Sequence, residues 1–421
     1  MTRAKMLALS TAMALTLPAM ARAADPADVV STYADIASAG YADSLTTAKA
    51  LQAAVDALIA APSDETLKAA RDAWLASRAP YQQTEVFRFG NAVVDDWEGK
   101  VNAWPLDEGL IDYVAQGTAE NEENALAGLN VIATPKFTLS GTEVDATEIT
   151  PALISDTLQE ADGIEANVAS GYHAIEFLLW GQDLNGTEAG AGNRPYTDYV
   201  QGDGCTGGNC DRRAAYLKAA TDLLVSDLEF MAAQWAEGGE GRATVTADPQ
   251  AGLLAMLTGM GSLSYGEQAG ERMKLGLMLN DPEEEHDCFS DNTHNSHYYD
   301  GLGVRNVYLG SYTRVDGSGV SGPSLSELVA EKDAAVDGQL KAELDASVAA
   351  LGAIKAAAEG GFAYDMMLAP GNKEGEALIM GGVNGLVTQT KSIERAVAAL
   401  GLSKIDFEGS DSLDNPNAVF Q

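Results

Sequence analysis

Positively charged residues are scarce in this sequence of 421 residues. It has 26 lysines and arginines against 62 aspartates and glutamates, a formal net charge of −36 at pH 7. Such a surface repels nucleic acid and anionic lipid, which excludes both as partners, and it raises the local concentration of cations. A solvated acidic surface that only keeps the protein soluble is the simpler explanation for most of this charge.

Long apolar runs are absent outside the N-terminus. There, Arg3 and Lys5 precede an apolar run over 6–20, and Ala21-Arg22-Ala23 is a small-x-small cleavage sequence. The pattern is typical of a secretory signal peptide over residues 1–23, cleaved after Ala23. A transmembrane anchor is the alternative, but the run is short for one. We expect an exported protein with no integral membrane span, located in the periplasm if the source is a Gram-negative bacterium.

Cysteines are few as well. Cys205 and Cys210 enclose the loose stretch TGGN, and we predict a disulfide bond between them, since an exported chain can form disulfides. Cys288 is then left as a free, buried thiol.

Runs of β-branched residues are also scarce, and alanine, leucine, glutamate and lysine dominate, which favours an all-α fold. Apolar spacing and end signals predict helices over 27–60 (broken at Gly40), 66–89 (kinked at Pro80), 151–180 (as one helix or two), 211–236, 249–279, 325–357 (after a capping box that starts at Ser324) and 376–400.

Three segments interrupt these helices: 115–150, which ends in a small β-hairpin, 181–210 and 281–323. We therefore predict two packed four-helix-type bundles, over 24–180 and 211–421, joined by a connection rich in glycine and aspartate at 181–210. The repeated pattern in EVFRFG (85–90) and ERMKLG (271–276) is consistent with an internal duplication.

Several catalytic motifs are missing. The sequence has no H-E-x-x-H, no G-x-S-x-G and no P-loop. A G-x-G-x-x-G match at 202–207 follows no strand and falls in the predicted disulfide loop, so we do not interpret it as a dinucleotide-binding motif.

One histidine and one glutamate stand in an almost wholly apolar stretch, GYHAIEFLLWGQD (171–183). His173 and Glu176 are three residues apart, so on a helix they share a face. An imidazole nitrogen and a carboxylate oxygen are a common pair of metal ligands. The alternative is a buried hydrogen bond between the two, but ionisable groups in apolar surroundings need partners in either case.

A second candidate ligand comes from RAPYQQTEVFRFG (78–90). Trp74, Tyr81, Glu85 and Arg88 follow helical spacing, which predicts one inward-facing stripe. Glu85 is then a further carboxylate ligand, and Arg88 neutralises or orients it. An exposed ion pair between the two is the alternative. Acids just downstream, Asp95 among them, can reach the same site.

Three of the four histidines, His286, His294 and His297, fall in EEEHDCFSDNTHNSHYYDG (283–301), together with Asp291 and other acids. Metal binding and a polar loop that orders itself through side-chain bonds to the backbone explain this cluster equally well. We include His286, Asp291 and His294 in a binding cleft.

These three blocks resemble the imelysin family. GYHAIEFLLWGQD is similar to its signature G-x-H-x-x-E, which continues into W-G-x-D, and ARDAWLASRAPYQQTEVFRFG is similar to its N-terminal block. EEEHDCFSDNTHNSHYYDGLGVRNVYLG resembles the branch called iron-regulated protein A. The resemblance implies two helical bundles with a site in the cleft between them, to which His173, Glu176 and Gly171 contribute. It also implies either metallopeptidase activity or a role in iron uptake.

We predict a non-enzymatic periplasmic protein that binds a metal ion or metal chelate in iron uptake or handling, with His173, Glu176 and Glu85 as ligands. Iron is favoured over zinc, because ferric iron is a hard cation and this chain is rich in carboxylates. Other cell-envelope proteins of iron uptake are the expected partners. The alternatives are a metallopeptidase that uses the same residues, and a module that binds a peptide, glycan or protein without metal.

Overall fold

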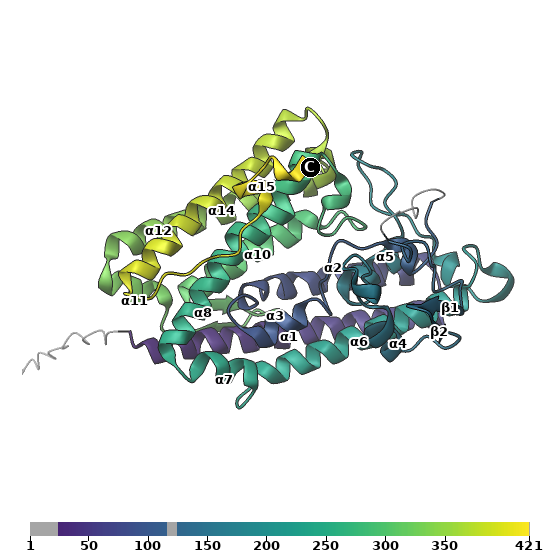
Figure 1. Cartoon of the computed structure of the whole chain (residues 1–421), viewed down its shortest axis with the longest axis horizontal. Helices are drawn as coiled ribbons and strands as arrows, with labels where there is room; N and C mark the ends of the chain where they lie inside the picture. The colour runs from purple at the N-terminus through teal and green to yellow at the C-terminus, as the bar shows by residue number, and fades with distance from the viewer. Residues whose placement is uncertain (1–23, 116–123, 421) are drawn as a thin grey trace, which may run out of the picture.

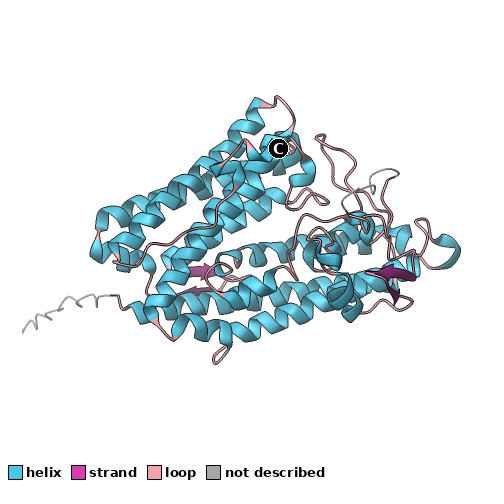
Figure 2. Ribbon diagram, in the orientation of Figure 1, coloured by secondary structure: helices cyan, strands magenta, loops and turns pink. Residues whose placement is uncertain are grey.

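The computed structural model describes residues 24–115 and 124–420, so the predicted signal peptide, residues 1–23, lies outside the described residues. Helices dominate, with two small antiparallel strand pairs (Figure 2), and the predicted all-α fold is confirmed. The principal helices are α1 (Pro26–Ala60), α2 (Asp64–Gln82), α3 (Ala92–Glu98), α5 (Gly171–Trp180), α6 (Cys210–Trp235), α7 (Glu240–Thr246), α8 (Pro249–Ser262), α10 (Thr293–Leu309), α11 (Leu325–Lys332), α12 (Ala334–Glu359) and α14 (Lys373–Ala399). None of the helices described is long and apolar enough to cross a membrane.

The first bundle is built around α1. This helix begins at Pro26, with the Asp25 side chain accepting from the backbone of Ala27, which satisfies one of the free amides of the first turn. α2 and α6 run along it (Figure 1), and α5 packs on both α2 and α6. Trp235 at the end of α6 contacts the rings of Tyr33 and Tyr41 of α1.

The second bundle consists of α10, α12 and α14 together with the π-helix η7 (Leu263–Leu275). In Figure 1, α12 and α14 lie side by side above α10. A core cluster that includes Met273, Leu351 and Leu386 fills this bundle, and a larger cluster runs from α1 through α8 and α10 to α14. The two bundles are therefore in direct contact.

The predicted boundary at 181–210 does not separate the helices of the two bundles. α6 follows that boundary, yet it packs along α1 in the first bundle. Its buried residues, among them Tyr216, Leu224 and Leu228, have the helical spacing that an apolar face requires. The segment 181–210 therefore joins two helices of one bundle.

Several predicted helices differ in the structure. Of the helical segment predicted over 151–180, only α5 is a regular helix of more than one turn; α4 (Pro151–Leu153) and the π-helical turn η3 (Ile154–Leu158) are short. α1 is not broken at Gly40; a Cβ there would lie 2.9 Å from Thr84, so the glycine allows a close approach to the chain after α2. α2 includes Pro80 and ends at Gln82 instead of running to residue 89; the amide of Thr84 bonds to the Tyr81 carbonyl three residues back, at 2.7 Å, which is a turn and not an α-helical contact. The short 3-10 turn η1 (Glu85–Phe87) follows.

The segment 281–323 contains a helix that its composition did not predict. α10 is rich in asparagine, histidine and glycine, all poor helix formers. Its buried face, which includes His297, Asp300, Val304 and Tyr308, packs against α12 and α2. Tertiary contacts thus override the weak local propensity.

The predicted β-hairpin and helix cap are confirmed. β1 (Lys136–Leu139) pairs antiparallel with β2 (Thr142–Asp145), and β3 (Ser311–Thr313) pairs with β4 (Gly319–Ser321). The capping box of Ser324 and Glu327 starts α11. The predicted helix at 325–357 is divided because the Asp333 side chain caps a second helix, α12.

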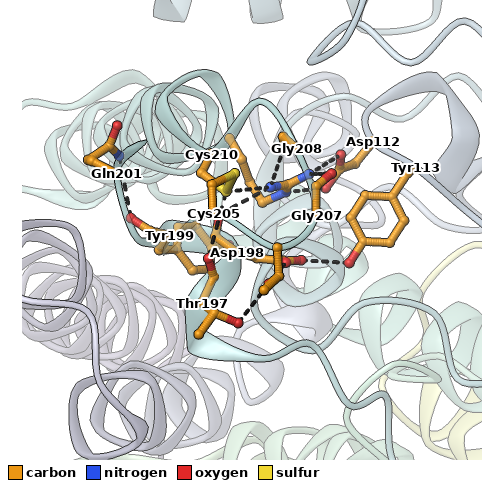
Figure 3. The surroundings of a disulfide bond; sticks show 12 residues. Asp112, Tyr113, Thr197, Asp198, Tyr199, Gln201, Cys205, Gly207, Gly208 and Cys210 are labelled. Atoms are coloured by element: carbon orange, nitrogen blue, oxygen red, sulfur yellow. Dashed lines mark hydrogen bonds and ion pairs between the residues drawn. A yellow bond between two sulfur atoms is a disulfide. The ribbon is translucent and has the colours of Figure 1, made fainter. Parts of the chain in front are cut away.

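The predicted disulfide between Cys205 and Cys210 is also confirmed. Cys288 is a free thiol as predicted, but it is half-buried and not fully buried. Figure 3 shows that Asp112 and Asp198 lie close to the disulfide. Asp112 belongs to a buried ion-pair network, in which Arg213 and Arg194 bind it at 2.6 and 2.8 Å. The backbone amide of Arg194 donates to the Trp180 carbonyl at 2.7 Å. The network therefore holds the C-terminal end of α5 in place.

Candidate metal site

The helix that carries the paired histidine and glutamate is buried on all sides, since every residue of α5 is buried. Polar side chains on such a helix must find partners in the interior. Its start is fixed by Gly171, whose φ is +80°. The next amide, of Tyr172, donates to the Val101 carbonyl at 2.7 Å. A Cβ at Gly171 would lie 2.4 Å from that oxygen, so only glycine fits.

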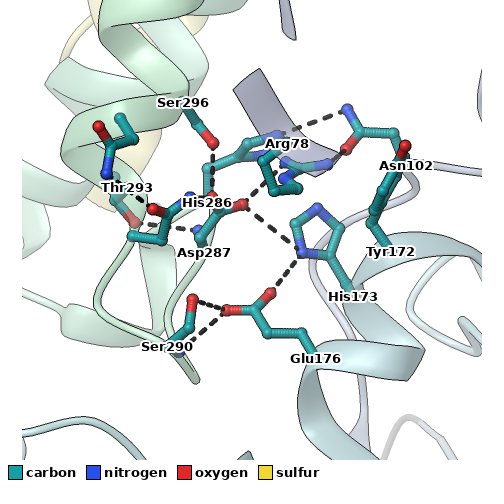
Figure 4. Close-up of polar contacts among 12 residues, drawn as sticks. Arg78, Asn102, Tyr172, His173, Glu176, His286, Asp287, Ser290, Thr293 and Ser296 are labelled. Carbon is teal, nitrogen blue, oxygen red and sulfur yellow. Dashed lines mark hydrogen bonds and ion pairs between the residues drawn. The ribbon is translucent and has the colours of Figure 1, made fainter. Parts of the chain in front are cut away.

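His173 and Glu176 face each other on α5 (Figure 4). Nδ1 of His173 lies 3.0 Å from Oε2 of Glu176. The other carboxylate oxygen accepts from the backbone amide and the hydroxyl of Ser290, at 2.9 and 2.6 Å. The pair therefore also binds a loop from distant sequence, residues 285–292. Nε2 of His173 has no hydrogen-bond partner among the described residues.

This loop brings a second histidine and an aspartate to the pair. Oδ1 of Asp287 lies 3.9 Å from His173 Nδ1, and the rings of His173 and His286 have centroids 4.8 Å apart. One ligand atom from each of His173, His286 and Asp287 lies within 4.8 Å of the other two. Within the described chain, Nδ1 of His286 also lacks a partner. Two imidazoles and a carboxylate, with unpaired buried nitrogens, are a donor set that suits a transition-metal ion.

Asp287 is held by several donors. The Arg78 guanidinium binds its Oδ1 at 2.8 Å, while the Asn292 amide and the Ser296 hydroxyl donate to its Oδ2 at 2.7 and 2.5 Å. Arg78 also donates to Asn102, whose amide nitrogen lies 3.4 Å from Nε2 of His286. Such contacts around the donor groups fix their orientation.

Burial and the Arg78 charge set the protonation states. Burial, followed by Arg78, lowers the pKa of His173 to about 3, and burial lowers that of His286 well below its usual value. Burial is the largest single effect on Asp287 and opposes its ionisation, but Arg78, His173 and the hydrogen bonds from Ser296 and Asn292 together outweigh it, so the pKa is lowered. Burial and the Asp287 charge raise the pKa of Glu176 well above its usual value. At neutral pH both imidazoles are uncharged, which is the form that binds metal.

Glu85, predicted as a ligand, is buried in a neighbouring network. Its Oε2 pairs with Arg272 of η7 at 2.7 Å. Arg272 also binds Glu267 at 2.7 Å and Asp300 at 3.2 Å. Because α2 ends before η1, Glu85 does not continue the stripe of Trp74, and it points to the second bundle instead of to His173. The structure does not bring it to the histidines, and its role as a ligand stays a prediction.

Arg88 and Asp95 belong to the same network. Arg88 pairs with Asp95 at 3.0 Å and lies 3.5 Å from both Glu98 and Glu267. Through Glu98, which accepts from Asn102 at 3.1 Å, this network adjoins the histidine site.

His286, Asp291 and His294, which we predicted in one binding cleft, have different neighbours in the structure. His286 joins His173. Asp291 lies with Asp183 and Asp365 instead. Nε2 of His294 lies 3.0 Å from the amide of Asn295.

Sequence reasoning did not identify Asp287, Arg78 or Asn102 as site residues. Arg78 has a usable signal: it is four residues after Trp74 and three before Tyr81, so it lies on the buried stripe of α2. Asp287 adjoins His286, but several acids in that segment are equally close in sequence. Asn102 has no such signal.

Glu98 provides a test of the electrostatics beside the site. Burial, and then the charge of Glu85, raise the pKa of Glu98 to about 7, although Arg88 and Arg272 oppose this. Since the folded pKa exceeds the unfolded value of about 4.3, the stabilising contribution is present below that value and is lost as pH rises through 7. Glu98→Gln lacks this titrating group, so it does not lose stability in this way. The unfolding free energy of Glu98→Gln minus that of wild type should therefore be about 2 kcal/mol larger at pH 8 than at pH 5, since one pKa unit corresponds to about 1.4 kcal/mol.

Urea unfolding at both pH values measures this difference. Glu376→Gln, at an exposed position of α14, is the control and should show no change with pH relative to wild type. The same behaviour in Glu98→Gln would contradict the prediction.

Both the sequence and the fold of this chain are similar to those of known proteins. The imelysin family model matches residues 37–393. Iron-regulated protein A of Synechococcus elongatus is 28% identical over 114 residues, which are 27% of this chain and 32% of that protein. The matched part thus spans about a third of that relative's length.

Two solved structures share the fold. An iron-regulated protein A precursor from Parabacteroides distasonis has a TM-score of 0.64 at 19% identity, covering 91% of this chain and 98% of that chain. An imelysin-like protein from Psychrobacter arcticum has a TM-score of 0.57 at 16% identity, covering 91% of this chain and 99% of that chain.

Proposed function

This chain belongs to the imelysin family, and on that premise we propose that it binds one iron ion through His173, His286 and Asp287. Glu176 takes a supporting role. Its carboxylate holds Nδ1 of His173 and, through Ser290, the loop that carries the other two ligands.

The observation that carries this proposal is the convergence of the three ligand atoms within 4.8 Å in a fully buried place. His173 lies on α5, and the other two residues come from a loop more than 100 positions away in sequence. Nitrogen and oxygen ligands of a transition-metal ion lie about 2.0–2.2 Å from it, so small rotations suffice for one ion to contact all three.

The donor set favours iron. Two histidines and one carboxylate form the ligand set of non-haem ferrous sites. The name of the relative, iron-regulated protein A, agrees with this choice. The negative net charge of the chain would draw cations to the protein.

The ion is cargo in this proposal: the protein would hold iron in the cell envelope and pass it to other proteins of iron uptake. A periplasmic location follows from the predicted signal peptide. Detection of a chain starting at Ala24 in a periplasmic extract would support it, and a full-length cytoplasmic chain would contradict it.

Metal titration of the untagged protein tests the site. Wild type should bind one equivalent of Fe(II) under anaerobic conditions. His173→Ala should lose at least about 100-fold in affinity, and Glu176→Gln about 10- to 100-fold, as is usual for residues that orient a ligand. His294→Ala is the matched control, because this histidine bonds to Asn295 and lies outside the ligand cluster.

Equal affinity in wild type and His173→Ala, with both proteins folded, would contradict the proposal. Incubation with unstructured peptides, with and without a chelator, separates the peptidase alternative, since a metallopeptidase would cleave them only without chelator.

A further inference from the structure

Three aspartates from distant segments meet close to the predicted cleft. Asp183 follows α5, Asp291 lies in the 285–292 loop, and Asp365 belongs to the short helix α13 (Tyr364–Leu368). One carboxylate oxygen of each lies within 4.8 Å of the other two. They share no residue with the histidine site, which also uses the 285–292 loop.

Asp365 gives an independent sign that something binds there. Its side chain is 2% exposed, and neither carboxylate oxygen has a hydrogen-bond partner in the part of the chain that the structure describes. An unpaired buried carboxylate is costly. Two other buried aspartates have several partners: Asp112 binds two arginines, and Asp287 binds Arg78 and two neutral donors.

Mutual repulsion adds to this cost. Burial, and then the charges of Asp365 and Asp183, raise the pKa of Asp291 to about 7. Burial raises that of Asp365 to about 6, with Asp183 adding to the effect and the adjacent backbone amide of Met366 opposing it. Glu285 is also 2% exposed, with Oε1 unpaired among the described residues. A cation among these groups would relieve both the repulsion and the missing contacts.

We propose that Asp183, Asp291 and Asp365 form a second metal site, specific for a hard divalent cation, and that calcium is the ion it binds. The donors are all oxygens, which calcium prefers, while the histidine site offers nitrogens. Calcium binds oxygens at about 2.3–2.6 Å, so oxygens up to about 5 Å apart can share one ion. Water can complete the usual 6–8 ligands, because Asp183 and Asp291 are only half-buried.

Such an ion would link three segments: the chain after α5, the 285–292 loop and α13 of the second bundle. The same loop carries His286 and Asp287. Calcium would therefore fix the position of two ligands of the proposed iron site without touching iron itself.

The test is thermal unfolding of the full-length mature protein after removal of metals with a chelator. Addition of CaCl2 should raise Tm by about 3 °C once calcium exceeds its Kd about 100-fold, given the size of the chain. KCl at equal ionic strength is the reference, because any salt screens the strongly negative net charge of the chain. Asp365→Asn, which keeps the shape but removes the charge, should abolish the calcium-specific increase, and Asp291→Asn should reduce it.

Two controls keep this test separate from that of the iron site. Asp203→Asn, at an exposed position, and His173→Ala should both retain the calcium response. No increase beyond that of KCl in wild type, or the same increase in Asp365→Asn, would overturn the proposal, whatever the iron titration shows.

Discussion

Replacing Arg78 with methionine is expected to destabilise the protein by about 3–5 kcal/mol, the cost of removing one partner of a buried ion pair. The Arg78 side chain is fully buried and binds Asp287 at 2.8 Å and Asn102 at 2.7 Å. Its guanidinium also lies over the ring of Tyr172, 4.9 Å from the centroid. Methionine fills similar space but leaves the Asp287 carboxylate buried without its cation.

Chemical unfolding measures the loss, and two further variants show its origin. Arg305→Met removes a more exposed pair with Asp345 and should cost less than about 1 kcal/mol. Arg78→Met combined with Asp287→Asn should recover part of the loss, since the uncompensated charge is then gone. If Arg78→Met lowers the unfolding free energy no more than Arg305→Met does, the buried pair of Arg78 and Asp287 does not stabilise the protein as predicted.

Replacing Gly171 with alanine is the second change with a large expected effect, about 3 kcal/mol or more. Two penalties combine. A positive φ costs a residue with a Cβ roughly 1–2 kcal/mol, and the new Cβ would lie 2.4 Å from the Val101 carbonyl oxygen and 2.6 Å from its carbon. Both atoms belong to the backbone, so they cannot rotate away, and the start of α5 must shift.

Gly141→Ala separates the two penalties. Gly141 has nearly the same φ, +79°, and a Cβ there would meet nothing within 4 Å. The loss of unfolding free energy in Gly141→Ala should therefore be only the roughly 1–2 kcal/mol that a positive φ costs. In Gly171→Ala, the shift of α5 should also weaken Fe(II) binding, because His173 is two residues away. Equal destabilisation in the two variants would show that the contact with Val101 is unimportant.

Local chemistry was enough for several features. The box of Ser324 and Glu327 starts a helix, because its contacts form within one turn. The Cys205–Cys210 disulfide closes a loop of a few residues. The facing of His173 and Glu176 follows from helical spacing alone.

Features that depend on long-range contacts escaped prediction. The helix α10 forms from weak helix formers because its buried face packs on α2 and α12. Glu85 was predicted beside the histidines, but the end of α2 at Gln82 turns it toward Arg272. Neither outcome can be read from residues close in sequence.

The sequence by itself determined the helical class, the covalent loop and the presence of one histidine–glutamate pair in apolar surroundings, because each depends on neighbours within a turn or a short loop. Only the tertiary structure decided which groups surround that pair. His286 and Asp287 reach His173 from a loop more than 100 residues away. Arg78 and Asn102 come from the first bundle. Packing between the bundles sets these distances, and it depends on the whole buried surface of both.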